Sequence, residues 1–289
     1  EPGGVLRYGV PAYRFSKEFL KEELEDIIDL GVNFECNHPI RKTGAAEALL
    51  SKGFEAVFIA TGLWDAVGIF EDKPKGVYNS VAFLSSPHTD LADSVQNQVK
   101  GKRVAVIGGG SVAMDCAGYA QTLGAQDVYL VYRRSFNQMP AEADERIETL
   151  ENGVHFLVLN QPKEYVTDSS GQVTGITLAR TQLAPAKGDD RRAPVEVPNS
   201  QWTLDVDLVV EAIGNKAFDD SDKAYPGVNT DDKNLITAST DNCKTSQQGI
   251  FAGGDIVRGP SLVVNAVQDG KTAADNIDVY LQQKRGSHE

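Results

Sequence analysis

A glycine-rich turn constrains the fold of this chain more than any other feature of its sequence. Residues 103–116 read RVAVIGGGSVAMDC, which is a short apolar strand, three glycines and the start of a helical pattern. The G-x-G-x-x-A spacing matches the dinucleotide-binding fingerprint, in which alanine can replace the third glycine. Gly108 permits the tight turn, Gly110 lets a pyrophosphate approach the backbone, and Ala113 lets the helix pack closely on the strand.

The helix after this turn is expected to begin at Ser111 and Val112. The first N–H groups of a helix have no partners inside the helix, and the helix dipole places partial positive charge beside them. We therefore expect the phosphates of a dinucleotide to lie at this N-terminus.

Two arginines indicate which dinucleotide fits. Residues 128–132 are the next apolar strand, and Arg133 and Arg134 follow it directly. An NAD site would carry an acidic residue near this position to bind the ribose 2′-hydroxyl. A guanidinium instead suits a 2′-phosphate, which it can hold through two hydrogen bonds. The pattern favours NADP, and the competing interpretation is an α/β turn followed by a solvated basic pair.

Size and charge limit the remaining classes. A chain of 289 residues can bury a large core and is expected to form two domains. Its net charge of −13 argues against a nucleic-acid or anionic-membrane partner. It contains no apolar run of about 18 residues, so no segment is expected to span a membrane, and it shows no basic-then-apolar signal segment at its start. A cytoplasmic, reduced compartment is the default expectation.

Cysteine and histidine usage argues against several kinds of centre. Cys36, Cys116 and Cys243 are widely spaced and form no C-x-x-C, which argues against a disulfide framework, a redox dithiol and an iron–sulfur ligand run. The four histidines show no metal-ligand spacing, so the sequence predicts no metal site.

Periodicity and turn residues predict the elements between these motifs. Before the glycine turn we expect an ordered loop over 1–15, a helix from the N-cap Ser16 to Gly31, strands over 32–36 and 56–60 (the second central in a parallel sheet), and a linker with short helical pieces over 63–99. After the turn we expect a helix over 111–123, a helix starting at Met139–Pro140, a strand over 154–159, and an antiparallel excursion over 163–205 with turns at Ser170–Gly171 and Lys187–Asp190. The last expected elements are strands over 207–214 and 249–253 and a long helix from Ser261. Gly270 inside the last helix costs about 1 kcal/mol relative to alanine, which suggests close packing there.

Together the motifs resemble one family. They are similar to the pyridine-nucleotide half of the glutamate synthase small-subunit family, of which the electron-entry module of dihydropyrimidine dehydrogenase is a relative. The matching segments are GGVLRYGVPAYRF at 3–15, ATG at 60–62, IGGGSVAMDC at 107–116, YRR at 132–134 with Met139–Pro140, AIG at 212–214, and GIFAGGD at 249–255 with the helix that follows. They occur in the family's order and cover nearly the whole chain.

The resemblance implies an α/β protein with two Rossmann-like dinucleotide-binding domains. Residues 1–98 and 216–289 would form a discontinuous FAD-side domain, and residues 99–215 would form an NADPH-binding domain inserted within it. Family members carry an earlier glycine fingerprint for the FAD pyrophosphate, and no second fingerprint occurs here. We therefore expect the first βαβ unit of the FAD side to be absent, so that the chain is a fragment or another chain supplies that unit. FAD binding by this chain alone is the open point.

The family's cofactor contacts carry over to particular positions. Gly4 and Leu6 would lie by the flavin, Thr61 and Gly62 near the cofactors, and Ile213 and Gly214 on the nicotinamide side. Asp255, after Gly254, would accept a hydrogen bond from an FAD hydroxyl, and the last helix would direct its N-terminus, with Leu262 and Val263, at the flavin ring. The alternative is a solvated turn aspartate at 255 and ordinary turn chemistry at the other positions.

The implied activity is electron input: hydride passes from NADPH to FAD, and electrons pass to a partner subunit or domain with an iron–sulfur or flavin centre. No catalytic acid, base or nucleophile is nominated. A short-chain dehydrogenase is a weaker alternative, because its Y-x-x-x-K pattern, Tyr280 to Lys284, lies at the chain end, and a disulfide reductase would need a cysteine pair. A flavin-free NADP-binding or scaffold subunit remains a third possibility. The final electron acceptor is not indicated.

Overall fold

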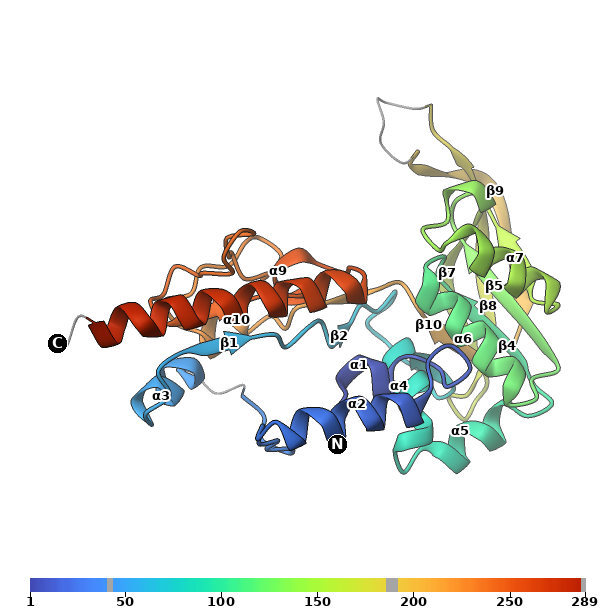
Figure 1. Ribbon diagram of the computed structural model, residues 1–289. Helices are drawn as coiled ribbons and strands as arrows, with labels where there is room; N and C mark the ends of the chain where they lie inside the picture. The colour runs from blue at the N-terminus through green and yellow to red at the C-terminus, as the bar shows by residue number, and fades with distance from the viewer. Residues whose placement is uncertain (41–43, 186–191, 287–289) are drawn as a thin grey trace. The chain divides into compact units, whose positions relative to one another are not determined.

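The computed structural model describes residues 1–40, 44–185 and 192–286. They form two compact units (Figure 1). Unit 1 comprises Glu1–Cys36 and Ala66–Gly214, and unit 2 comprises Asn37–Asp65 and Asn215–Glu289. These divisions differ from the expected domain boundaries, because residues 1–36 and 66–98 group with the glycine turn and not with the C-terminal part.

Unit 1 is built on a five-stranded parallel sheet in the order β3-β10-β4-β5-β6. Its strands are β3 (Val77–Asn79), β4 (Arg103–Ile107), β5 (Asp127–Tyr132), β6 (His155–Val158) and β10 (Leu208–Glu211). The central strands are continuous apolar runs because helices or a second sheet cover both of their faces. β3 lies within the expected linker, where its three residues carry too little periodicity to be recognised.

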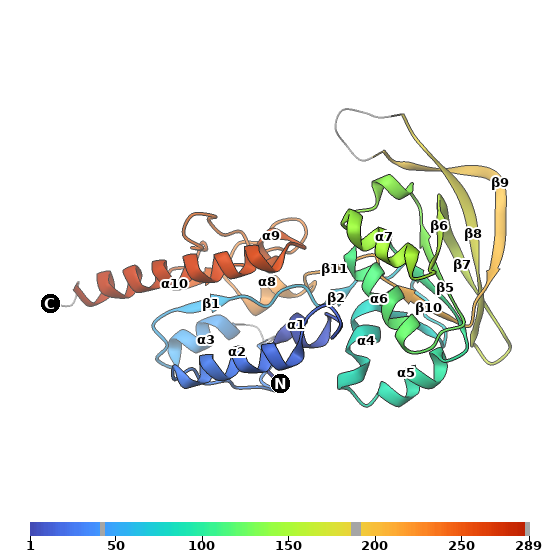
Figure 2. The same ribbon diagram turned by 45° about the vertical axis from the view of Figure 1, so that its right-hand side comes forward.

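Alternating side chains of β4 divide the core of unit 1 into two layers. Val104 and Val106 pack in a cluster with Ala113 and Met114 on one face, whereas Ala105 belongs to the cluster on the other. The first layer is covered by helices and the second by an antiparallel sheet (Figure 2). The helical elements of unit 1 are α1 (Gly4–Tyr8), α2 (Lys17–Asp29), α4 (Ser80–Ser85), η1 (Ser86–His88), α5 (Ala92–Val99), α6 (Ser111–Thr122), η2 (Phe136–Gln138) and α7 (Ala143–Glu151).

The expected antiparallel excursion is confirmed as the sheet β7-β8-β9. Its strands are β7 (Asn160–Thr167), β8 (Val173–Leu183) and β9 (Pro194–Asp205). The turn at Ser170–Gly171 is also confirmed, with Gly171 at a φ of +77°. The expected turn at Lys187–Asp190 lies outside the described residues.

Helix starts follow capping chemistry, which confirms one expectation and corrects another. The Ser16 side chain accepts a hydrogen bond from the N–H of Phe19 at 3.2 Å and caps α2 as expected. α7 begins at Ala143 and not at Pro140, because Glu142 and Glu145 form a reciprocal capping box that fixes the start. The strand expected over 32–36 is wrong: this segment is irregular, its apolar side chains are exposed, and no strand pairs with it among the described residues. Residues 4–8, expected as loop, are helical.

Unit 2 contains a parallel pair, β1 (Val57–Ile59) with β12 (Ile250–Ala252). Ile250 packs toward Ala46 in one cluster, while Phe251 packs against Ala273 in another, so both faces of the pair are covered. Within the described residues this sheet has two strands, so the central position expected for residues 56–60 is wrong. The remaining elements of unit 2 are α3 (Ala45–Ser51), β11 (Asn215–Lys216), α8 (Ser221–Ala224), α9 (Asp255–Arg258) and α10 (Val263–Gly286), and β2 (Asp65–Ala66) lies where the chain passes from unit 2 to unit 1. β2 pairs with β11.

The long C-terminal helix is confirmed as α10, beginning two residues after Ser261. The close packing expected at Gly270 is wrong, because an added Cβ there would have no atom within 4 Å. The close contact of α10 is instead with Gly253, whose added Cβ would lie 2.8 Å from the Cβ of Asp269 on that helix. No helix among the described residues is long and apolar enough to cross a membrane.

Candidate dinucleotide-binding sites

The three glycines after β4 differ in what surrounds them. A Cβ added to Gly108 would overlap the carbonyl oxygen of Ala212 and lie 3.1 Å from the Cβ of Ala113. A Cβ on Gly109 would lie 2.6 Å from the ring of Tyr132. Packing within the chain therefore explains the first two glycines. At Gly110 the nearest atom would be 3.7 Å away, an ordinary contact, so packing within the chain does not require a glycine at the position where the fingerprint lets a pyrophosphate approach.

The N-terminus of α6 has the features of an anion site. Gly110 is its N-cap and offers no side chain to the first N–H groups. Val112 in the first turn is 46% exposed, so this end of the helix is open to solvent. The Ser111 hydroxyl donates to the Glu145 carboxylate at 2.6 Å. The first turn thus combines N–H groups free of a side-chain cap with a hydroxyl that already has an acceptor.

Arg133 and Arg134 follow β5, the strand beside β4, but their environments differ. Arg134 is half-buried, and its Nε donates to the carbonyl oxygen of Arg192 at 3.0 Å. Arg133 is exposed, and its guanidinium makes no hydrogen bond or ion pair with the residues that the structure describes. Of the two, Arg133 has the more available guanidinium. The Arg133 backbone is fixed, since its carbonyl oxygen accepts from the Thr181 hydroxyl at 2.8 Å.

Ile213 and Gly214 are brought to the same edge as the glycine turn. They follow β10, which pairs with β4, and the Ala212 N–H donates to the carbonyl of Ile107 at 2.8 Å. Ile213 is 42% exposed, and Gly214 has a φ of +113°. β4 and β10 are also where the strand order of the sheet reverses, and open α/β sheets bind ligands at the carboxyl ends of such strands.

A buried carboxylate that sequence reasoning missed anchors this edge. Glu211 ends β10, and its side chain has no exposed surface. It accepts hydrogen bonds from the hydroxyl of Tyr165 at 2.6 Å and the N–H of Ile69 at 3.0 Å, and it pairs with the ammonium of Lys73 at 2.8 Å. The available signal was a charge inside the apolar run LVVEAIG.

A second polar cluster ties the N-terminal segment to α6. The Arg14 guanidinium pairs through Nε with Asp115 on α6 and through Nη1 with Glu145 on α7, the latter at 3.0 Å. Tyr13 donates to the backbone carbonyl of Asp115 at 3.2 Å. Burial raises the pKa of Asp115 to about 6, although Arg14 opposes the shift. Sequence reasoning missed this cluster, since its members are distant along the chain.

In unit 2, Thr61 and Gly62 follow β1, and Gly254 and Asp255 follow β12. Because the two strands are parallel, both segments lie at the same edge, and the N–H of Gly253 donates to the carbonyl of Ile59 at 3.1 Å. Gly62 and Gly254 both have positive φ angles, +65° and +73°. The structure therefore brings these four predicted residues to one edge of the pair. Burial raises the pKa of the Asp255 carboxyl.

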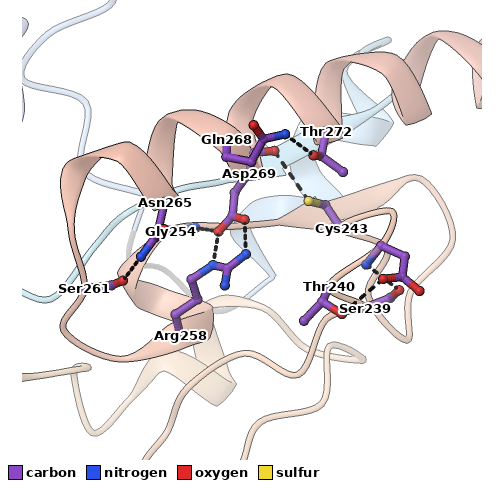
Figure 3. Close-up of polar contacts among 11 residues, drawn as sticks. Ser239, Thr240, Cys243, Gly254, Arg258, Ser261, Asn265, Gln268, Asp269 and Thr272 are labelled. Carbon is purple, nitrogen blue, oxygen red and sulfur yellow. Dashed lines mark hydrogen bonds and ion pairs between the residues drawn. The ribbon is translucent and has the colours of Figure 1, made fainter.

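Asp269 fixes the turn around Asp255 through its hydrogen bonds with Gly254 and Arg258, which Figure 3 shows. Its carboxylate extends from α10 and accepts from the N–H of Gly254 at 2.8 Å and from Nε and Nη2 of Arg258 at 2.7 and 2.5 Å. Asp269 is 4% exposed, and the hydrogen bonds from Arg258 hold the pKa of its carboxyl below the usual value. Sequence reasoning missed this residue too. The open N-terminal end of α10 presents Leu262 and Val263, which are 65% and 54% exposed.

Gly4 and Leu6 lie elsewhere. Both belong to α1 in unit 1, where Gly4 is exposed at a φ of +51° and Leu6 is half-buried. The predicted residues thus form a group at the carboxyl edge of the unit 1 sheet, a group at the corresponding edge of unit 2, and this pair in α1.

Comparisons with known proteins agree with this fold. The family described as pyridine nucleotide-disulphide oxidoreductase matches residues 17–270, and the chain belongs to that family. It is 38% identical over 285 residues to the NADP(+)-dependent formate dehydrogenase subunit beta of Moorella thermoacetica, covering 97% of this chain and 39% of the relative. It is 33% identical over 293 residues to the glutamate synthase [NADPH] small chain of Escherichia coli (strain K12), covering 98% and 62%. The chain therefore spans less than two thirds of these relatives.

A solved structure shows the same fold at low sequence identity. Mycobacterium tuberculosis FprA in complex with NADPH superimposes with a TM-score of 0.76 at 19% identity, covering 100% of this chain and 77% of that one. The two Rossmann-like domains expected from the sequence are therefore supported at the level of fold class.

The three cysteines are unpaired, with Cys36 exposed and Cys116 and Cys243 buried. Burial raises the pKa of both buried thiols, which keeps them protonated and weakly nucleophilic.

Proposed function

We propose that the chain is the NADPH-binding and flavin-binding module of an electron-input oxidoreductase. Unit 1 binds NADPH at the carboxyl edge of its parallel sheet, with the pyrophosphate at the N-terminus of α6 and the 2′-phosphate at Arg133 and Arg134. The observation that carries the proposal is that packing within the chain requires glycine at 108 and 109 but not at 110, which leaves the approach of a pyrophosphate as the reason for the third glycine. The relatives named for NADP or NADPH support the same cofactor.

FAD is assigned to the C-terminal side. Thr61, Gly62, Gly254 and Asp255 share one edge of unit 2, and the exposed N-terminal end of α10 offers its N–H groups to an anionic flavin ring. When both cofactors are bound, they supply the hydride transfer, so the chain's task is to bind and orient them. In this proposal residues 1–98 and 216–289 serve the flavin and residues 99–215 serve NADPH.

The electrons leave to a partner subunit or domain with an iron–sulfur or flavin centre, and the module works in the cytoplasm. The formate dehydrogenase relative is named as a subunit, which favours a partner-dependent role. No acid, base or nucleophile of this chain is needed for hydride transfer between cofactors.

The test is a visible absorption spectrum of the purified chain, followed by anaerobic addition of NADPH. The proposal expects a bound flavin whose absorption near 450 nm bleaches on addition of NADPH and not of NADH at the same concentration. Asp255→Asn serves as the matched variant for flavin content, and Arg133→Ala with Arg134→Ala serves for dinucleotide choice. A flavin that stays oxidised under NADPH would refute electron input.

A second candidate is a flavin-free NADP-binding subunit. It is favoured by the described part of the unit 2 sheet, whose two strands would hold FAD less firmly than a full doubly wound sheet. A colourless chain that still binds NADPH would support this candidate, and titration with added FAD would then measure what the flavin half-site retains.

A further inference from the structure

The N-terminus of α6, where the proposed function places a pyrophosphate, is flanked by two carboxylates. Asp115 lies in the second turn of α6, with its side chain 10% exposed, and Glu145 lies in the first turn of α7, with its side chain 19% exposed. A dinucleotide pyrophosphate carries negative charge, and like charges close together in a site of low dielectric oppose binding. Something in the chain must offset these two charges if the site is to hold an anion.

Arg14 is the cation that meets both. Its Nε pairs with Asp115 and its Nη1 lies 3.0 Å from Glu145, so one guanidinium bridges two helices. Arg14 is held in place from the other side, because Tyr13 donates to the backbone carbonyl of Asp115 and the N–H of Arg14 donates to the carbonyl of Pro11 at 3.0 Å. The cation comes from the segment before α2, far along the chain from the glycine turn.

Glu145 also competes for a donor that the site can use. The Ser111 hydroxyl, at the first position of α6, donates to Glu145 Oε2 at 2.6 Å. A serine hydroxyl has one hydrogen, so it cannot donate to Glu145 and to a phosphate oxygen at the same time. When Ser111 turns to a phosphate, Glu145 keeps the N–H of Glu142 at 3.2 Å and the Arg14 guanidinium. The Arg14 pair therefore makes release of Ser111 less costly.

We propose that Arg14 is a positioning residue for NADPH: it pairs with both Asp115 and Glu145 beside the N-terminus of α6, offsets one of their two negative charges, and frees Ser111 for the phosphate. This inference rests on the proposed function of unit 1. It assigns to the N-terminal segment, which the family resemblance places on the flavin side, a part in binding the other dinucleotide. Arg14 itself need not touch the ligand.

The experiment is a fluorescence titration of this chain with NADPH. We expect Arg14→Gln to raise the Kd about tenfold, since two carboxylates then lack their cation. We expect Glu145→Gln to lower the Kd about threefold, because it removes a negative charge and weakens the hold on Ser111. The double variant R14Q/E145Q should recover to within about threefold of the wild-type Kd, with the buried Asp115 taking up a proton.

A matched control distinguishes this role from general stability. Arg103→Gln breaks a comparable arginine–carboxylate contact in the same unit, with Asp207 at 3.2 Å, at the start of β4 and away from the turn. It should leave the Kd unchanged. The tighter binding of E145Q keeps the proposal testable if R14Q does not fold, because a damaged site would weaken binding. A wild-type Kd in R14Q, unchanged or weaker binding in E145Q, or failed recovery in the double variant would each overturn it.

The outcome separates this inference from the function on which it rests. If the wild-type chain shows no saturable binding of NADPH, the proposed function fails and the role of Arg14 fails with it. If the wild type binds NADPH and R14Q binds equally well, only the role of Arg14 fails.

Discussion

Replacing Gly110 with alanine should separate the stability of the glycine turn from its capacity to bind a pyrophosphate. Gly110 has a φ of −95° and a ψ of 174°, which an alanine adopts without strain. Its added Cβ would meet its nearest atom, Pro140 Cγ, at 3.7 Å, an ordinary contact. Alanine is a poorer N-cap than glycine by roughly 0.5 kcal/mol, whereas it lowers the entropy of the unfolded chain by a similar amount. The free energy of unfolding should therefore change by less than about 0.5 kcal/mol.

Binding should respond differently. A phosphate oxygen must come within about 2.9 Å of a backbone nitrogen to accept its hydrogen bond, and the new methyl group would occupy that approach. Losing one or two charge-assisted hydrogen bonds at about 1.5 kcal/mol each corresponds to a 10- to 100-fold increase in the Kd for NADPH.

The neighbouring glycine supplies the opposite control. Gly109→Ala would place its Cβ 2.6 Å from the Tyr132 ring, which should cost about 1–3 kcal/mol of stability. Urea unfolding and NADPH titration of the two variants together decide the matter. A G110A variant that binds NADPH like the wild type, or one that loses as much stability as G109A, would refute the assignment of that space to a pyrophosphate.

Arg133→Ala should reduce the preference for NADPH over NADH more than Arg134→Ala, because the Arg134 guanidinium already donates to a carbonyl; the ratio of the two Kd values measures this, and equal effects would contradict it. Asp269→Asn should lower the urea midpoint at pH 7 by depriving Arg258 of its anion, and this loss should fade as the pH falls through the depressed pKa of Asp269. A pH-independent loss would argue against the ion pair. The pKa of Asp115 is raised from 3.8 to about 6, so the stability that its protonated form contributes is present below pH 3.8 and is lost as the pH rises through 6. Between pH 3.8 and 6 the free energy of unfolding of Asp115→Asn should therefore rise by up to about 3 kcal/mol relative to that of the wild type, as measured by urea unfolding. A difference between the two proteins that does not change with pH would contradict the raised pKa.

Local chemistry made part of the fold predictable. β4, the glycine turn and α6 were predicted because three local signals lie within 14 residues: an apolar run, glycines at the spacing of the fingerprint, and the start of a helical pattern. The start of α2 was predicted because its Ser16 cap acts on an N–H only three residues later. In each case the interactions that define the element are encoded next to one another.

The predictions that failed depended on which segments meet. Residues 32–36 have an alternating pattern, but a strand needs a partner, and the structure gives that segment none among the described residues. Likewise, the dinucleotide-binding fingerprint predicts no role for Gly109, because the ring that packs against it, Tyr132, belongs to the next strand. The candidate site was predicted where residues act through the local backbone and missed where Glu211, Asp269 and Arg14 support it through distant partners.

Helical glycines show why such partners are hard to infer. Gly270 and Gly118 both lie inside helices, where glycine costs about 1 kcal/mol relative to alanine, so each invites an explanation by close packing. At Gly270 the space is open, whereas a Cβ on Gly118 would lie 2.6 Å from the Tyr13 hydroxyl. Tyr13 crosses α6 at that point and sets Arg14 against Asp115. A helical glycine therefore marks a close approach only where another segment crosses the helix, and here that crossing packs the N-terminal segment against α6 in unit 1.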